Sequence, residues 1–317
     1  MNIVLSTDNN FVQHCAATLV SLLENNKGLI NIYILSEGLT DSNNRILEEI
    51  VLARGGNFKY IQVDSDLIQS LPMPYLKSTS HISLATYYRL VIPFLLPSSI
   101  NKVIYLDCDI IIRKSIKELW EVDIETFAVA AVYQITQRTI KDAIRLGYDP
   151  SYGYFNAGVL LINLSYWRQH NITKKLLSYL TTNQNRIIFH DQDALNAVLH
   201  DKSFKISCKW NMLTIFFIKR TLIINDEFEG KIINDYLDYK KSFPKEALDP
   251  TIIHFVAKPK PWDPYCTHPF RIEYYNYLVQ TPWYTFKEPK TFYSSVYRFL
   301  KRVKNKIINP DNSYFSS

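Results

Sequence analysis

Residues 103–110 read Val103-Ile104-Tyr105-Leu106-Asp107-Cys108-Asp109-Ile110, an apolar run followed by two aspartates with one residue between them. In an extended chain alternate side chains point to the same face, so Asp107 and Asp109 can converge on one hard cation. Open α/β sheets bind ligands at the carboxyl ends of their strands, which is where this pair lies. The stretch therefore predicts a buried strand that ends at a metal site. The structural alternative is a pair of turn-forming or helix-capping aspartates.

The sequence on both sides of this stretch alternates short apolar runs with helical patterns, as a βαβ architecture requires. Strands are expected at residues 2–5, 30–35, 58–63, 102–106, 129–132 and 159–164. Helices are expected at residues 11–23, 41–53, 85–94 and 191–199. After Trp210 the periodicity weakens into aromatic and proline-rich loops. The predicted fold class is therefore α/β, with a nucleotide-binding type of sheet and a smaller C-terminal region.

The composition is that of a folded protein, because 317 residues of which 47% are hydrophobic can bury a sizeable core. No uncharged apolar run approaches the roughly 20 residues that span a bilayer, and no basic and apolar signal segment follows Met1. We therefore expect a cytoplasmic protein. The cysteines are widely spaced, which favours reduced thiols over disulfides or a zinc cage. They are Cys15, Cys108, Cys208 and Cys266.

The net charge of +6 is concentrated near the end of the chain. Between Lys287 and Lys306 there are seven basic residues and one acidic residue, and the rest of the chain has 29 basic and 29 acidic residues. Apolar residues recur at helical spacing from Tyr293 to Ile307. The pattern favours a basic amphipathic helix on an anionic membrane surface. A solvated helix packed on its own domain and a nucleic-acid-binding helix are the alternatives.

Paired aspartates after a strand also open the active site of aspartate-nucleophile phosphatases. Those enzymes have a small residue such as threonine or valine two positions after the second aspartate, where this chain has Ile111. They also need a later lysine and a Gly-Asp cluster, and the 8 glycines of this chain include no Gly-Asp pair. Because the motif lacks its context, we set the phosphatase class aside.

Six motifs in order make the sequence resemble glycosyltransferase family 8, and within it the bacterial lipooligosaccharide galactosyltransferases. The resemblance extends from Met1 to about Pro282 and implies a GT-A fold over residues 1–282, with a basic membrane-association tail over residues 283–317. The motifs are Ile3-Val4-Leu5-Ser6-Thr7-Asp8-Asn9-Asn10, His81-Ile82-Ser83 through Tyr87-Tyr88-Arg89-Leu90, Tyr105-Leu106-Asp107-Cys108-Asp109, Tyr154-Phe155-Asn156-Ala157-Gly158-Val159-Leu160-Leu161-Ile162-Asn163-Leu164, Asp191-Gln192-Asp193, and His254 through Lys260-Pro261-Trp262.

A third metal ligand is expected at His254, which follows an apolar run. A lone histidine in such a place is more often a core residue than a ligand. Together, the paired carboxylates and the resemblance make His254 the partner of Asp107 and Asp109. Imidazole and carboxylates suit a divalent ion, and we expect manganese, with magnesium as the alternative. Pyrophosphate oxygens of a UDP-sugar donor would complete the coordination.

The resemblance also implies a set of donor-binding residues. Asp8 and Asn10 would contact the uracil edge and the ribose, and Arg89 would contact the sugar or a phosphate. Without the resemblance, a helix cap and an exposed helix arginine are the structural alternatives. The full set is Asp8, Asn10, His81, Ile82, Thr86, Arg89, Asp107, Cys108, Asp109, Asn156, Ala157, Asp191, Gln192, His254, Ala257 and Lys260.

The predicted catalytic residues are Asp191 and Gln192. By resemblance, Gln192 lies beneath the anomeric carbon and Asp191 accepts a sugar hydroxyl. Because an amide is a poor nucleophile, attack by the acceptor hydroxyl on the face that UDP leaves is favoured over a covalent intermediate. Lys260 would stabilise the β-phosphate, where charge accumulates as the glycosidic bond breaks. Ordinary helix N-terminal chemistry is the structural alternative for Asp191 and Gln192.

Two departures from the family pattern bear on the phosphates and the acceptor. This chain has Ala257 where relatives commonly place a glycine, and Val132-Tyr133-Gln134 where the lipooligosaccharide enzyme has an acidic acceptor contact. The expected reaction is retaining transfer of a hexose, galactose favoured over glucose, to lipooligosaccharide or another cell-surface glycan. The alternatives are a glycosylated surface adhesin or capsule acceptor, and a non-catalytic sugar-nucleotide-binding scaffold. The expected partners are a UDP-hexose, a lipid-linked acceptor and the inner face of the cytoplasmic membrane, but no nucleic acid.

Overall fold

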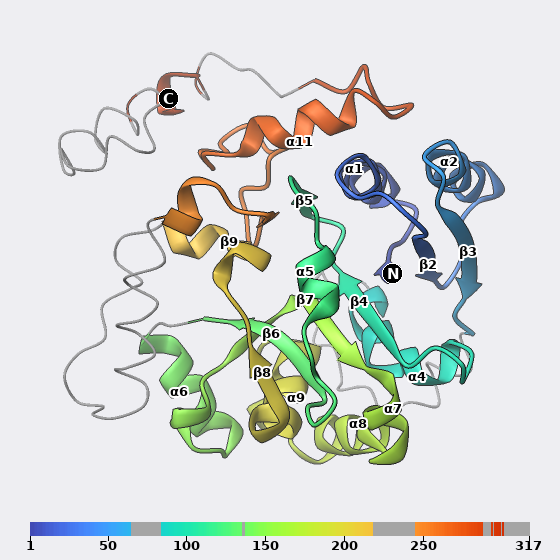
Figure 1. Cartoon of the computed structure of the whole chain (residues 1–317). Coiled ribbons are helices and arrows are strands. Elements are labelled where there is room, and N and C mark those ends of the chain that lie inside the picture. The colour runs from blue at the N-terminus through green and yellow to red at the C-terminus, as the bar shows by residue number, and fades with distance from the viewer. Residues whose placement is uncertain are drawn as a thin grey trace.

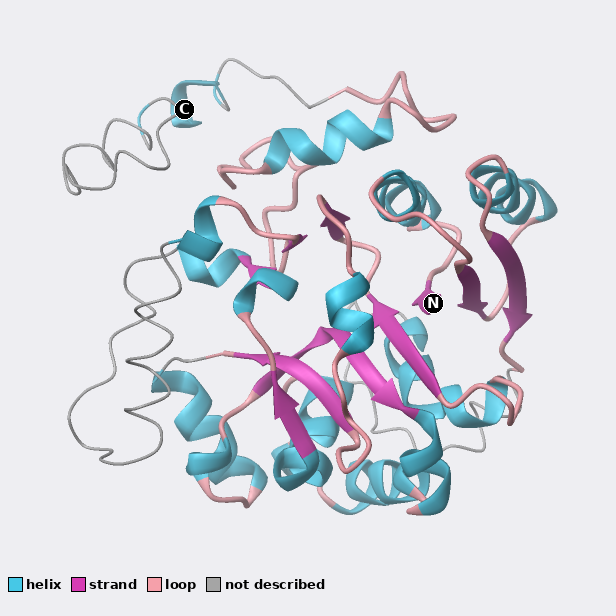
Figure 2. Cartoon of the chain, in the orientation of Figure 1, coloured by secondary structure: helices cyan, strands magenta, loops and turns pink. Residues whose placement is uncertain are grey.

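The computed structural model describes residues 1–64, 84–134, 137–217, 245–287, 293, 295–298 and 300. These residues form a large sheet, a small sheet, and helices on both sides of the large sheet (Figure 1). Figure 2 shows the strands of the large sheet in the middle of the molecule, between the helices. The α/β class predicted from the sequence is confirmed.

Seven strands form the large sheet in the order β3-β2-β1-β4-β7-β6-β8. The first four in this order are parallel, whereas β7 runs antiparallel to both β4 and β6. Consequently β7 begins at the edge of the sheet where β1 and β4 end. The bounds are β1 Asn2–Ser6, β2 Asn31–Ser36, β3 Asn57–Gln62, β4 Lys102–Leu106, β6 Val129–Tyr133, β7 Phe155–Asn163 and β8 Ser203–Lys205.

Alternate strand residues face opposite sides of the large sheet and divide the core into two layers. Ile3 and Ile104 pack with helices α1 and α2, whereas Val4 and Leu160 pack with α7, α8 and α9. The result is a three-layer sandwich, with α11 beside α1 (Figure 1). The helices are α1 Val12–Glu24, α2 Asp41–Leu52, α4 Ile92–Leu95, α5 Lys117–Glu121, α6 Gln137–Leu146, α7 Leu164–Gln169, α8 Ile172–Thr182, α9 His190–Leu199 and α11 Arg271–Leu278.

The small sheet positions the last part of the predicted site. It consists of β5 Ile110–Ile112, β9 Met212–Leu213 and β10 Ile252–His254, with β10 in the centre. β5 follows Asp109 directly, and the antiparallel pairing of β5 with β10 sets His254 opposite Ile110. This register brings a histidine from far along the chain beside the paired aspartates.

One predicted helix was wrong. Residues 85–94 do not form a single α-helix but a 3-10 helix, Leu84–Val91, followed by the short helix α4. Pro93 explains the break, because proline has no amide hydrogen and its ring clashes with the carbonyl four residues earlier. In the structure Pro93 lies in the first turn of α4, where neither effect matters.

The predicted strand at residues 159–164 is observed with shifted bounds. β7 begins at Phe155, so Asn156, Ala157 and Gly158 lie inside the strand, and Leu164 already belongs to α7. The other predicted strands and helices are found within one or two residues of their expected bounds. All four cysteines are buried, and none of them forms a disulfide with a described residue.

Among the described residues, no helix is both long enough and apolar enough to cross a membrane. The predicted basic amphipathic helix lies mostly outside the described residues, apart from Lys287 and a few positions between Tyr293 and Leu300. Of these, Tyr293 is 77% exposed and Leu300 58% exposed. Tyr297 contacts Tyr265 edge-to-face, with ring centroids 5.6 Å apart.

Candidate active site

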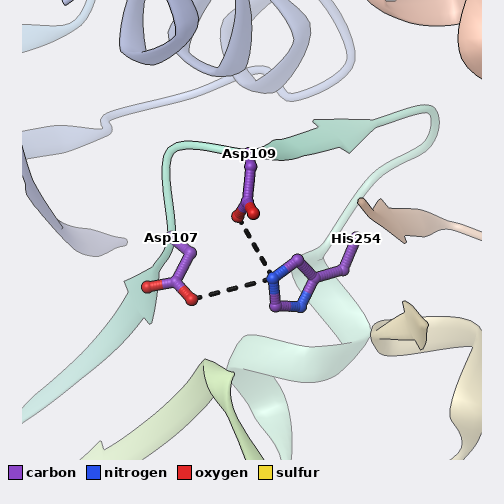
Figure 3. A group of neighbouring side chains, drawn as sticks. All are labelled: Asp107, Asp109 and His254. Carbon is purple, nitrogen blue, oxygen red and sulfur yellow. Dashed lines mark ion pairs between the residues drawn. The ribbon is translucent and has the colours of Figure 1, made fainter. Parts of the chain in front are cut away.

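Three side chains that can hold a metal ion meet beyond the end of β4, namely Asp107, Asp109 and His254 (Figure 3). One ligand atom from each lies within 4.8 Å of the others. His254 Nε2 is 3.1 Å from Asp109 Oδ1 and 3.7 Å from Asp107 Oδ2. Two carboxylates and one imidazole are a donor set that suits a divalent transition-metal ion. The residues present therefore fit the predicted metal.

Backbone hydrogen bonds hold the three ligands in this arrangement. The amide of Asp107 donates to the carbonyl of Gly158 at 2.8 Å, which joins the end of β4 to β7. The amide of Phe255 donates to the carbonyl of Asp109 at 3.0 Å, which joins the end of β10 to the start of β5. Asp107 is thus held against β7, and Asp109 is held against the end of β10, beside His254.

Gly158 permits the close approach of the ligands. A Cβ atom at this position would lie 2.1 Å from His254 Cε1 and 2.8 Å from Asp107 Oδ2. Such distances are far shorter than van der Waals contact, so any side chain at residue 158 would push the imidazole and the carboxylate apart. The glycine in the motif Asn156-Ala157-Gly158 therefore has a steric role beside the metal ligands.

Arg89 lies buried between two carboxylates of the site. Its guanidinium is 2.9 Å from Asp107 Oδ1 and 2.9 Å from Asp191 Oδ2, and it also donates to the carbonyl of Ala157. Burial alone would lower the pKa of Arg89, but the two carboxylates raise it above its ordinary value. The structure therefore excludes an exposed helix arginine and makes Arg89 the fixed positive charge that orients Asp107 and Asp191.

The carboxyl group of Asp191 has an unusual environment at the start of α9. Burial raises the pKa of Asp191 from 3.8 to about 7, because its effect outweighs that of the positive charge of Arg89, which lowers the pKa. Asp191 Oδ2 receives no hydrogen bond, because the nearby Arg89 Nε–H is directed at the carbonyl of Thr86. A buried carboxylate oxygen without a donor is suited to accept a hydrogen bond from a ligand hydroxyl.

Lys260 reaches the site from the loop after β10. Its ammonium donates to Asp109 Oδ2 and to the carbonyl of Phe255. Burial alone would raise the pKa of Asp109, but Lys260 and His254 hold it well below its usual range. In this structure the cation predicted to stabilise a phosphate therefore neutralises the predicted metal ligand Asp109.

Hydrogen bonds to both the oxygen and the nitrogen of its side-chain amide fix Gln192 in place. Its Oε1 accepts from Asn156 Nδ2 and from the amide of Ala157, each at 3.0 Å. Its Nε2 donates to the hydroxyl of Tyr154, also at 3.0 Å. Because both acceptor directions of the oxygen are used, the amide is held in one orientation and its oxygen is a weak nucleophile.

Sequence reasoning missed Asn211, which lies between the metal ligands and Gln192. It is fully buried, contacts His254 Nδ1 at 2.9 Å, and donates from Nδ2 to Asn156 Oδ1 at 2.8 Å. No local pattern distinguishes an asparagine that follows Trp210 in a loop from any other loop asparagine. Its role becomes visible only when the small sheet has placed it beside His254.

The structure describes most of the remaining predicted residues. Asp8 Oδ1 accepts from the amides of Asn10 and Phe11 at 2.9 and 3.0 Å in the turn before α1, whose N-cap residue is Phe11, while Asn10 itself is exposed. Cys108 is buried and donates to the carbonyl of Ser6 at 3.2 Å. Ala257 is exposed and has a φ of +63°. His81 and Ile82 lie outside the described residues.

The fold is of the GT-A class, and its site has a group of residues that could hold a metal ion. The chain belongs to glycosyl transferase family 8, whose family model matches residues 2–266. The family and the enzyme class predicted from the sequence are therefore confirmed.

The chain is also similar to individual proteins across most of its length. The chain is 32% identical to general stress protein A of Bacillus subtilis, across 91% of this chain and 96% of the relative. It is 26% identical to lipopolysaccharide 1,3-galactosyltransferase of Salmonella typhimurium, across 89% of this chain and 79% of the relative. It is also similar to the crystal structure of galactosyltransferase LgtC in complex with donor and acceptor sugar analogs. There the TM-score is 0.75 at 24% identity, and the match covers 89% of this chain and 96% of that chain, which shows the shared fold.

Proposed function

We propose that the protein is a metal-dependent retaining glycosyltransferase that transfers a hexose from a UDP-sugar to lipooligosaccharide or another cell-surface glycan. The observation that carries this proposal is the convergence of Asp107, Asp109 and His254 in a chain of glycosyl transferase family 8. The similarity to a lipopolysaccharide 1,3-galactosyltransferase supports galactose as the sugar and a lipid-linked glycan as the acceptor. Glucose is the alternative sugar, and a glycosylated adhesin or capsule is the alternative acceptor.

Asp107, Asp109 and His254 would hold the cation, with manganese favoured over magnesium. When bound, a divalent cation supplies Lewis-acid stabilisation of the diphosphate as it leaves. Lys260 lies beside Asp109 and would turn toward the β-phosphate when the donor binds. Its ammonium would then stabilise the negative charge that accumulates on the leaving group.

Asp191 and Gln192 would orient the donor sugar. Asp191 Oδ2, buried and without a hydrogen-bond donor, would accept a bond from a sugar hydroxyl. The locked amide of Gln192 would lie beneath the anomeric carbon without attacking it, because its oxygen already accepts two hydrogen bonds. Orientation of this kind contributes to rate by holding the donor in a reactive geometry.

The proposed reaction exchanges one bond at the anomeric carbon for another. The bond between the anomeric carbon and the β-phosphate oxygen breaks, and UDP leaves with the electron pair. The acceptor hydroxyl forms the new bond on the same face of the sugar, and its proton passes to the departing phosphate oxygen. The configuration at the anomeric carbon is thereby retained without a covalent sugar–enzyme intermediate.

Release of UDP by the purified protein tests the proposed transferase activity. A panel of UDP-sugars is incubated without acceptor, with manganese or with a chelator. Manganese-dependent hydrolysis of one donor would establish the donor chemistry and identify the sugar. No release from any donor, although UDP still binds, would favour the non-catalytic sugar-nucleotide-binding scaffold instead.

The basic tail is proposed to bind the inner face of the cytoplasmic membrane. Exposed aromatic residues lie in its first part, with Tyr284 63% exposed and Tyr293 77% exposed, and its basic residues suit anionic headgroups. Deletion of the chain after Pro289 should reduce binding to vesicles that contain anionic lipid and should leave UDP release unchanged. Unchanged vesicle binding would favour the solvated helix packed on its own domain.

A further inference from the structure

An unbroken line of side-chain hydrogen bonds connects the predicted metal site with the start of α9. It passes from one polar side chain to the next through the buried centre of the molecule. Its successive contacts measure 2.9, 2.8, 3.0, 3.0 and 2.8 Å and join His254, Asn211, Asn156, Gln192, Tyr154 and Asp193.

The backbone of β7 fixes which atom donates and which accepts in these hydrogen bonds. The amide of Gly158 donates to Asn156 at 2.9 Å, so the atom that Asn156 presents there must be its oxygen. The amide of Ala157 donates to Gln192 in the same way. Backbone N–H groups cannot reverse their role, so the amide groups of Asn156 and Gln192 each have one permitted orientation.

This direction determines the protonation of the His254 ring. Asn156 Oδ1 faces Asn211, so Asn211 must present Nδ2 to it and turn Oδ1 toward His254. An amide oxygen only accepts hydrogen bonds, so His254 Nδ1 must carry the proton. Nε2 of the neutral ring then keeps its lone pair, and this is the atom that faces Asp107 and Asp109.

We propose that Asn211 is a positioning residue that holds His254 in the tautomer with Nδ1 protonated and thereby prepares Nε2 to bind a divalent cation. The inference rests on the proposed function only for the role of the cation. Asn211 also joins the metal ligand to the amide network of Gln192, so the two halves of the site are fixed by one side chain. Hydrogen bonds of this kind from a ligand's second ring nitrogen set its orientation and basicity.

The tautomer can be measured on the full-length protein without metal. Nitrogen-15 NMR distinguishes protonated from unprotonated ring nitrogens, and the His254 signals are assigned by their loss in His254→Gln. The neutral ring of the wild type should show a protonated Nδ1 and an unprotonated Nε2. Asn211→Ala should give a mixture of both neutral tautomers. A neutral wild-type ring protonated at Nε2 and not at Nδ1, or an unchanged spectrum in Asn211→Ala, would overturn the proposal.

Titration with manganese alone measures the consequence for binding. Asn211→Ala should weaken manganese affinity by about 10–100-fold, the range for loss of an outer-shell partner. The matched control is Asn26→Ala, because Asn26 is also buried and also makes two hydrogen bonds, to Leu22 and Ile116, but outside the site. Equal manganese affinity in Asn211→Ala and the wild type would contradict the proposal.

Asn211→Asp separates positioning from general destabilisation. An aspartate retains an acceptor for His254 Nδ1, so the tautomer and the manganese affinity should be preserved. Its second oxygen would face Asn156 Oδ1, which cannot turn away, so UDP release at saturating manganese should fall. Loss of manganese affinity in Asn211→Asp as severe as in Asn211→Ala would overturn the proposal. If the wild type neither bound manganese nor released UDP, the proposed function would fail, while the NMR measurement would still decide the role of Asn211.

Discussion

Two regions of the molecule contribute to the site in different ways. The amino-terminal region, from β1 to β5, contributes Asp107 and Asp109, which are separated by one residue at the end of a single strand. The carboxyl-terminal region, from β7 to β10, contributes Gly158, Gln192 and His254 from three separate elements. The first contribution is local in sequence, whereas the second exists only after the strands have paired.

The difference also appears in how the side chains are held. Asp107 and Asp109 follow β4 directly, and their carboxylates are oriented by the charges of Arg89 and Lys260. In the carboxyl-terminal region neutral amides form directed hydrogen bonds, such as that of Gln192 to the backbone of β7. Charges tolerate small shifts, but a buried amide that loses its partner leaves an unsatisfied polar group. We therefore expect the carboxyl-terminal region to be more sensitive to small changes of shape.

The largest effect is expected when one metal ligand is removed from either region. Asp109→Ala and His254→Ala should each lower metal-dependent UDP release by about three orders of magnitude. Lewis-acid stabilisation is worth several kcal/mol, and each 1.4 kcal/mol or so corresponds to a tenfold change in rate. The measurement is the rate of UDP release at saturating donor concentration with a fixed excess of manganese.

The double variant tests whether the two regions act through one cation. Because both ligands would serve the same ion, combining Asp109→Ala with His254→Ala should cause little loss beyond either single change. Asp201→Ala, which removes a partly exposed surface aspartate, is the control and should retain the wild-type rate. Independent, additive losses would show that the two regions do not share a cation.

A smaller effect is expected from a change of shape in the carboxyl-terminal region alone. Gly158→Ala adds one methyl group that would overlap His254 and Asp107. We expect manganese affinity to fall by about 10–100-fold, as when the support of a ligand is lost, and the free energy of unfolding to fall by about 1–3 kcal/mol from overpacking. Gly38→Ala is the control, since a Cβ there would meet nothing within 4 Å. Wild-type manganese affinity in Gly158→Ala would contradict the steric role of Gly158.

A pH profile tests the role of Asp191, the carboxylate of the carboxyl-terminal region that pairs with Arg89 of the amino-terminal region. With a pKa of about 7, Asp191 loses its proton as the pH rises, and only the ionised form can accept a sugar hydroxyl without competition from its own proton. UDP release should therefore rise about tenfold between roughly pH 6 and pH 8. Asp191→Asn should remove this rise. Manganese is kept saturating at every pH so that metal binding does not limit the rate, and an unchanged profile in Asp191→Asn would exclude Asp191 as its origin.

Much of the amino-terminal region could be predicted from the sequence. Strand β4 was predicted with its observed bounds, because a continuous apolar run between polar residues is typical of a buried parallel strand. The paired aspartates followed from their place at the end of that run. The helix predicted at residues 85–94 was wrong because Pro93 interrupts the apolar pattern around it.

The carboxyl-terminal region could be predicted only in part. Asn156 and Gly158 are residue types that strands disfavour, and they adopt strand geometry because β7 pairs with β4 and β6. Asn211 gave no signal, because its partners His254 and Asn156 are 43 and 55 residues away along the chain. The role of such a polar group depends on its neighbours in three dimensions, and the periodicity of the sequence does not reveal those neighbours.

The smallest expected effect concerns the loop that follows β10 and carries Lys260. Ala257 has a φ of +63°, a left-handed conformation that costs an L-residue with a Cβ about 1 kcal/mol or more. Ala257→Gly should therefore raise the free energy of unfolding by about 1 kcal/mol and the melting temperature by about 1–2 °C. The matched control is Ala53→Gly, because Ala53 is also exposed but has a φ of −59°, so the same substitution should lower stability. Calorimetry of both variants gives opposite signs if the left-handed backbone is the cause. A loss of stability in both would mean that the loop gains nothing from glycine, and that its conformation is held by the contacts of Lys260 with Asp109 and Phe255.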